Sequence, residues 1–88
     1  MTRTMDPVFR ALADSTRRWC LECLLEGDVR LLEFRELFPV RPATLLHHLR
    51  VLENSGLLVS WKEGPMRLYS FRREGLEEAA KWLRGMTR

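Results

Sequence analysis

The sequence of 88 residues predicts a single domain that is mainly α-helical with one small β-hairpin (α+β), in the order α-α-α-α-β-β-α. Apolar residues recur at helical spacing between residues 8 and 54, and again between residues 74 and 84. Between these regions, residues 57–62 and 66–71 are rich in β-branched and aromatic side chains and are joined by Glu63-Gly64-Pro65. Apolar residues make up 45% and charged residues 31% of the chain, which is typical of a globular protein.

Three short helices are expected before residue 40. The first begins with Asp6 as a cap and Pro7 at the first helical position, and the second begins at Asp14-Ser15-Thr16 and ends at Gly27. The third stops before Pro39, because a residue that precedes a proline disfavours the helical conformation. Their apolar stripes are, in chain order, Val8, Phe9 and Leu12, then Cys20, Cys23 and Leu24, then Leu31, Phe34, Leu37 and Phe38.

A fourth helix, from Pro42 to a glycine stop at Gly56, has two different faces. Leu45, Leu49 and Leu52 cluster on one side of the helical wheel. The opposite side carries Ala43, His47, Arg50 and Asn54, with Thr44 beside them. A helix that enters the DNA major groove needs small or hydrogen-bonding side chains near its start and a cation beside the phosphates.

The hairpin at residues 57–71 follows this helix directly, and a last helix is expected over residues 74–84. Leu76, Ala80 and Leu83 align on the last helix, and Gly85 is expected to end it. A helix, a turn, a second helix and then a hairpin form a winged helix-turn-helix, in which the hairpin is the wing. This order favours DNA binding more strongly than any single element does.

Composition and charge narrow the function further. No apolar run approaches the roughly 18 residues that span a membrane, and the first residues lack a signal-peptide core, so a cytoplasmic protein is expected. The net charge is +3, and every basic residue except Lys62 and Lys81 is arginine, the side chain suited to phosphate and guanine. No serine, cysteine or histidine has a plausible orienting carboxylate, and no glycine-rich loop follows a strand. We therefore expect neither an enzyme nor a cofactor.

The sequence resembles the ArsR/SmtB-type winged-helix regulators from about Asp14 to Phe71 and into the last helix. The matching residues are Asp14-x-Thr16-Arg17, Thr44-x-x-x-His48-Leu49-x-x-Leu52-x-x-x-Gly56-Leu57, and Gly64 and Tyr69 in the hairpin. The segment from His48 to Glu53, leading into Ser55-Gly56-Leu57, is the most specific. The resemblance implies a homodimeric transcriptional regulator, usually a repressor, whose terminal helices dimerise and whose fourth helix lies in the major groove.

Departures from the family pattern also predict that the usual metal-sensing sites are missing. Arg30 and Leu32 stand where the family commonly has cysteine ligands, and neither binds a thiophilic metal. The last helix contains Glu77 and Glu78 but no histidine. Cys20 and Cys23 leave an alternative open, since two thiols three residues apart on a helix could bind arsenite or Zn²⁺ or respond to oxidation. Core packing is favoured for both, because free cysteine behaves as a small buried hydrophobe.

The predicted contacts with double-stranded DNA come from the fourth helix and the wing. They are Arg41, Thr44, Leu46, His47, Arg50, Lys62 and Arg67. Leu46 is included because it stands where the family has a serine that faces DNA. His48, in contrast, is expected to be partly buried and to bond a backbone carbonyl.

The predicted dimer interface uses apolar residues of the first and last helices. They are Val8, Phe9, Leu12, Leu76, Ala79, Ala80 and Leu83. A chain of this size has too small a core to bury both stripes internally, so pairing across a two-fold axis is expected. Trp19 and Trp82 are interpreted as core or interface residues. The alternative from another class is a winged-helix module that binds a protein with the same surface. The sequence leaves open whether the protein has an effector.

Overall fold

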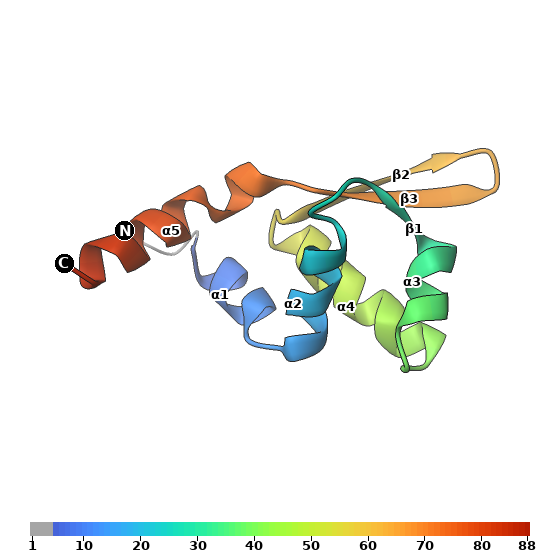
Figure 1. The fold of residues 1–88 in the computed structure, drawn as a ribbon, viewed down its shortest axis with the longest axis horizontal. Helices are drawn as coiled ribbons and strands as arrows, with labels where there is room; N and C mark the ends of the chain where they lie inside the picture. Colours follow the sequence, from blue (N-terminus) through green and yellow to red (C-terminus); the bar gives the residue numbers. More distant parts are fainter. Residues whose placement is uncertain (1–4) are drawn as a thin grey trace.

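The structure, a computed structural model, describes residues 5–88 and confirms the predicted winged helix-turn-helix (Figure 1). Its elements are, in chain order, α1 (Asp6–Leu12), α2 (Ser15–Cys23), β1 (Val29–Arg30), α3 (Leu31–Leu37), α4 (Pro42–Asn54), β2 (Leu58–Glu63), β3 (Met66–Phe71), the 3-10 helix η2 (Arg73–Leu76) and α5 (Glu77–Met86). None of the described helices is long and apolar enough to cross a membrane.

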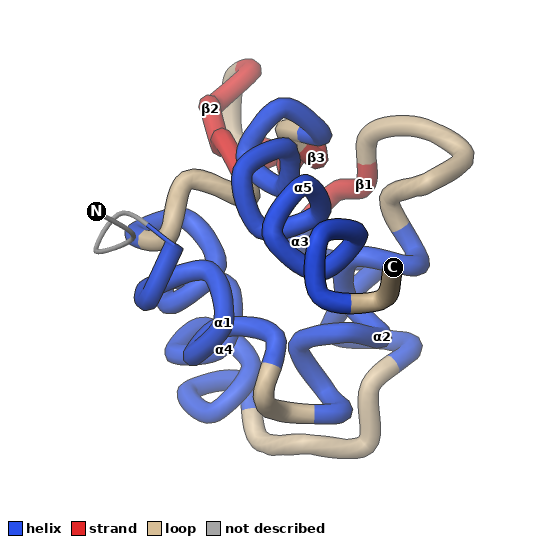
Figure 2. Tube along the Cα trace, turned by 90° about the vertical axis from the view of Figure 1, so that its left-hand side faces the viewer, coloured by secondary structure: helices blue, strands red, loops and turns tan. Residues whose placement is uncertain are grey.

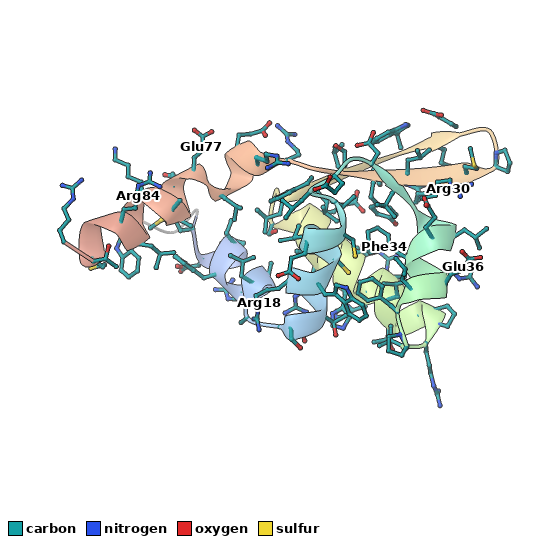
Figure 3. All side chains as sticks on the ribbon, in the orientation of Figure 1. Arg18, Arg30, Phe34, Glu36, Glu77 and Arg84 are labelled. Atoms are coloured by element: carbon teal, nitrogen blue, oxygen red, sulfur yellow. The ribbon has the colours of Figure 1, made fainter. Side chains whose placement is uncertain are left out.

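The core lies between the four N-terminal helices and one face of the sheet. Phe34 of α3 is completely buried, and its ring meets Phe38 and Tyr69 edge to face, with centroids 5.7 and 5.8 Å apart (Figure 3). These contacts join α3 to the sheet. The other buried residues of the cluster are Val8, Ala11, Cys20, Leu21, Leu24, Leu45, Leu49, Leu52, Leu57, Leu58 and Ala79.

The sheet has three antiparallel strands in the order β1-β3-β2. The hairpin pairs Leu58 with Phe71 at its base and Glu63 with Met66 at its tip, and Gly64 takes a positive φ of +58° in the turn. The sequence analysis did not predict β1, whose two residues, Val29 and Arg30, pair with Tyr69 and Leu68. A strand of two residues is too short to show an alternating pattern.

The turn between α4 and β2 explains why β2 begins at Leu58. The N–H of Gly56 donates to the carbonyl of Glu53, and the N–H of Leu57 donates to that of Leu52, both at 3.0 Å. This is a Schellman motif, which favours glycine because Gly56 has a φ of +87°. Leu57 therefore belongs to the capping turn that follows α4, and the predicted strand loses its first residue.

Three other boundaries differ from the prediction. Asp6 lies inside α1 instead of capping it, and α2 ends at Cys23, before Gly27. The last helix begins as the 3-10 turn η2 and continues through Gly85 to Met86. A single glycine costs only about 1 kcal/mol in a helix, and the Thr87 hydroxyl donates to the Arg84 carbonyl (3.0 Å) at the observed end.

Helix α5 extends away from the body, on the side opposite the hairpin, and gives the molecule extents of 45 × 24 × 22 Å (Figures 1 and 2). Ala79 faces the core, whereas Trp82, Leu83 and Met86 are 44%, 47% and 63% exposed. The helix therefore carries apolar surface that its own chain does not cover.

Candidate nucleic-acid interface

The face of α4 opposite the core is open to solvent. Thr44, His47 and Arg50 are exposed there, and Arg41 is exposed directly before the helix. No acidic residue lies in the first turn of α4, so nothing in that turn neutralises the positive end of the helix dipole. This face therefore presents hydrogen-bonding groups and cations together, which are the groups that read base edges and hold phosphates.

The wing residues Lys62 and Arg67 lie on the same side of the sheet as the helices. They are register partners in β2 and β3, so their side chains leave the sheet on one face. Ser60 and Tyr69 pair on that same face, and Tyr69 is buried in the core. The wing and α4 therefore contribute to one continuous surface.

Arg67 connects the wing to α4 through a short hydrogen-bond chain. Its Nη1 donates to Ser60 Oγ, and Ser60 Oγ donates to Glu53 Oε2, both at 2.9 Å. The sequence analysis predicted that both Lys62 and Arg67 contact DNA from the wing. In the structure Arg67 is half-buried and engaged with Ser60, whereas Lys62 is exposed.

A polar hollow of about 280 Å³ lies between α4 and the hairpin. It is lined by Leu46, Arg50, Glu53, Ser60, Arg67 and Tyr69. Leu46, predicted to face DNA, is half-buried at this hollow. The two arginines outnumber the one carboxylate, so the junction of α4 and the wing favours an anion.

Arg17 holds α4 in place, a role that the sequence analysis did not assign. Its Nε donates to the Ala11 carbonyl (2.7 Å), its Nη2 to the Arg10 carbonyl (3.1 Å), and its Nη1 contacts His48 Nδ1 (3.1 Å). Its backbone N–H also donates to the Asp14 carboxylate (3.1 Å), and this hydrogen bond lowers the pKa of Asp14. One side chain thus joins α1, α2 and α4.

The two adjacent histidines have different environments. His48 is half-buried, as expected, but its partner is Arg17 and not the predicted backbone carbonyl. Since a guanidinium only donates, His48 Nδ1 accepts this hydrogen bond. His47 is exposed on the outer face of α4, where a ligand can reach it.

Both cysteines sit in surroundings that suppress the thiolate. Cys20 is completely buried, and burial raises its pKa to about 12, while burial also raises the pKa of the half-buried Cys23. Within residues 5–88, no group of three or more His, Cys, Asp or Glu side chains is close enough to hold a metal ion. These surroundings favour core packing for the pair.

We therefore expect native Cys20 and Cys23 to resist alkylation. A raised pKa leaves both thiols protonated near neutral pH, and the thiolate is the nucleophile. Iodoacetamide at pH 7.5, followed by mass spectrometry, should label the native protein at least tenfold more slowly than the guanidinium-unfolded protein. Rapid native labelling, or arsenite-induced release of DNA that disappears in a Cys20→Ser, Cys23→Ser variant, would favour the thiol-responsive alternative.

The residues predicted to dimerise divide into two groups. Val8 and Ala79 are buried within the chain (5% and 3% exposed), so the expectation that both stripes lie free is wrong for these two. Phe9, Leu12, Leu76 and Ala80 are half-buried, and Leu83 is exposed. Phe9 and Trp82 meet edge to face with centroids 5.8 Å apart, so α1 and α5 form a single surface. The core is larger than expected because short helices pack Val8 and Ala79 against it.

Comparison with known proteins assigns the family. The chain is 36% identical over 92 residues to YuzN of Bacillus subtilis, described as an uncharacterized HTH-type transcriptional regulator; the match covers 94% of this chain and 99% of YuzN. The crystal structure of the ArsR family transcriptional regulator RHA00566 superposes with a TM-score of 0.91 at 28% identity, covering 99% of this chain and 90% of that one.

The chain belongs to the ArsR family of winged helix-turn-helix transcriptional regulators. It is also 29% identical over 79 residues to the transcriptional repressor SdpR of Bacillus subtilis, over 90% of this chain and 88% of SdpR. No protein-family model matches the chain. Family membership agrees with the exposed α4 face and makes the protein a DNA-binding regulator of transcription. Its relatives are transcriptional regulators, a non-enzymatic class.

Proposed function

We propose that this ArsR-family protein is a homodimeric repressor that binds a pseudo-palindromic operator and lacks the usual metal sensors of the family. The observation that carries the proposal is the solvent-open face of α4, which displays Thr44, His47 and Arg50, and the wing adds the exposed cation Lys62. SdpR, a relative of similar length, is named a transcriptional repressor, which supports repression as the mode of action.

The exposed apolar residues of α5 support a homodimer. Trp82, Leu83 and Met86 lie near the end of one helix, and Phe9 of α1 extends their surface. Contiguous exposed apolar side chains mark association sites. A two-fold axis through this surface would place two copies of α4 about one DNA turn apart, roughly 34 Å, as an operator with two half-sites requires.

Arg50 and His47 are expected to contribute differently to binding. Arg50→Ala should weaken binding to all duplexes and reduce the slope of log K against log salt by about one unit per protomer, because one phosphate contact is lost. His47→Ala should change the sequence preference, because His47 is placed to meet base edges. Fluorescence anisotropy with operator and random duplexes, at several salt concentrations, measures both effects.

Lys81→Ala is the matched control, since Lys81 is an exposed cation of α5 that does not lie on the α4 face. It should leave both the affinity and the salt slope unchanged. Unaltered DNA affinity in a folded His47→Ala, Arg50→Ala double variant would instead favour the alternative, a winged-helix module that binds a protein.

A further inference from the structure

A second hollow, of about 360 Å³, lies between the start of α3 and the tip of the wing. It is lined by Arg30, Leu31, Leu32, Arg35, Pro65, Met66 and Arg67. Figure 3 shows Arg30 where α3 begins below the hairpin, and its Nη1 lies 4.0 Å from the Sδ of Met66. The hollow is therefore bounded by two separate elements, and its volume is in the range of small-molecule sites.

We call the apolar part of the lining the floor of this hollow. Leu32 is 58% exposed and Met66 is 41% exposed, and Leu31 and Pro65 complete the surface. Leu31 packs against the core, which makes the α3 side firm. An apolar body of a few carbons could cover Leu32 and Met66 and remove their surface from water.

We call the charged part of the lining the rim of the hollow, and it is cationic. Every ionisable residue in the lining is an arginine: Arg30, Arg35 and Arg67. Arg30 is paired with Glu33 at one edge (3.1 Å), and Arg67 donates to Ser60, but within residues 5–88 the structure gives the Arg35 side chain no hydrogen bond or ion pair. Arginine presents its donors in a planar fork that matches a carboxylate.

We propose that this hollow binds a small amphipathic carboxylate, with its apolar tail on Leu32 and Met66 and its carboxylate beside Arg35. The charge of the rim selects an anion, and the floor selects an apolar body. Arg67 lines both this hollow and the polar hollow between α4 and the wing, so a ligand here touches a residue of the DNA-facing surface. A role for this carboxylate as an effector of DNA binding rests on the proposed function, whereas its binding to the hollow does not.

Octanoate is the probe that tests this site, with octanol and acetate as controls for charge and tail. Isothermal titration of the full chain should show saturable binding of one octanoate per protomer, with a dissociation constant on the order of 0.1–1 mM for a ligand of this size. Octanol should bind at least tenfold more weakly, and acetate should not bind measurably. Octanol binding as tight as octanoate would overturn the proposal, because the arginines would then contribute nothing.

Two variants of α3 provide a matched pair. Leu32→Glu places a carboxylate on the floor and should abolish octanoate binding, whereas Leu37→Glu, at an equally exposed position outside the hollow (57%), should retain it. Both sites are on the surface, so both variants should fold. Octanoate binding that survives in Leu32→Glu, or is absent in the unmodified protein, overturns the site.

Duplex DNA binding is measured in parallel to keep the two proposals distinct. Missing octanoate binding with intact, salt-dependent DNA binding would reject this site and leave the proposed function standing. If random duplex DNA displaces octanoate and Leu32→Glu weakens DNA binding as strongly as Arg50→Ala does, the hollow belongs to the DNA interface and the carboxylate proposal is wrong.

Discussion

Leu83→Glu is expected to convert the proposed dimer into a monomer and to weaken operator binding by about two orders of magnitude, because each α4 would then bind its half-site alone. Leu83 is 47% exposed on the projecting helix α5, next to Trp82, with Met86 one turn further on. When two copies associate, the charged carboxylate of this glutamate would be buried without an ionic or hydrogen-bonding partner. Sedimentation equilibrium at micromolar concentration and anisotropy with the operator measure the two effects.

Leu37→Glu is the control, since Leu37 is similarly exposed but lies on α3. It should remain dimeric, and both variants should keep the helical circular dichroism of the unmodified protein. A Leu83→Glu protein that sediments as a dimer would show that the exposed end of α5 is not the interface.

Arg17→Ala is expected to destabilise the fold by about 2–3 kcal/mol, measured as the free energy of unfolding in urea. The change removes three side-chain contacts of 2.7–3.1 Å, and it leaves the Ala11 carbonyl and His48 Nδ1 without their donor. Because His48 belongs to α4, the variant should also bind DNA more weakly than its stability alone requires. Arg17→Lys keeps the positive charge but not the planar guanidinium with its several N–H donors. It should therefore recover less than half of the lost free energy of unfolding.

Arg18→Ala is the comparison variant. Arg18 is exposed, and within residues 5–88 its side chain makes one hydrogen bond, from Nη1 to the Leu12 carbonyl (2.7 Å), so its removal should cost less than about 1 kcal/mol. Equal destabilisation by Arg17→Ala and Arg18→Ala would mean that the contact between Arg17 and His48 does not support α4.

The sequence predicted those features that arise from local periodicity. Leu45, Leu49 and Leu52 recur at helical spacing, and all three are buried. Gly56 is the residue that a helix-ending turn requires, and it occupies that turn with a positive φ. The boundaries of β3 were also predicted correctly, since aromatic and apolar side chains follow the turn residues Gly64 and Pro65 there and continue up to Phe71.

The features that the sequence did not predict depend on residues distant along the chain. Arg17 and His48 are 31 residues apart, and their contact exists only after α2 packs across α4. The strand β1 pairs with a hairpin almost 40 residues later. Val8 and Ala79 share one core although they lie near opposite ends of the chain, so their burial could not be judged from either helix alone.

Within the candidate site, the environment of Arg67 likewise could not be predicted from the sequence. Its position near the wing tip was evident from the sequence, but its engagement with Ser60 and Glu53 depends on how the hairpin lies against α4. Lys62, which has the same charge and the register position opposite Arg67, remains exposed. Charge and sequence position therefore indicated the candidate DNA-binding surface. The tertiary contacts determined which of the two wing cations stays exposed and open to a ligand.

The salt dependence of binding to an operator selected from genomic DNA tests the central proposal most directly. If each protomer of a dimer places Arg41, Arg50 and Lys62 on phosphates, the slope of log K against log salt should be about −5, and the complex should contain two protomers per site. A random duplex should bind more weakly with a similar slope. Affinity that does not change with salt, or no duplex binding at low salt, would contradict the account.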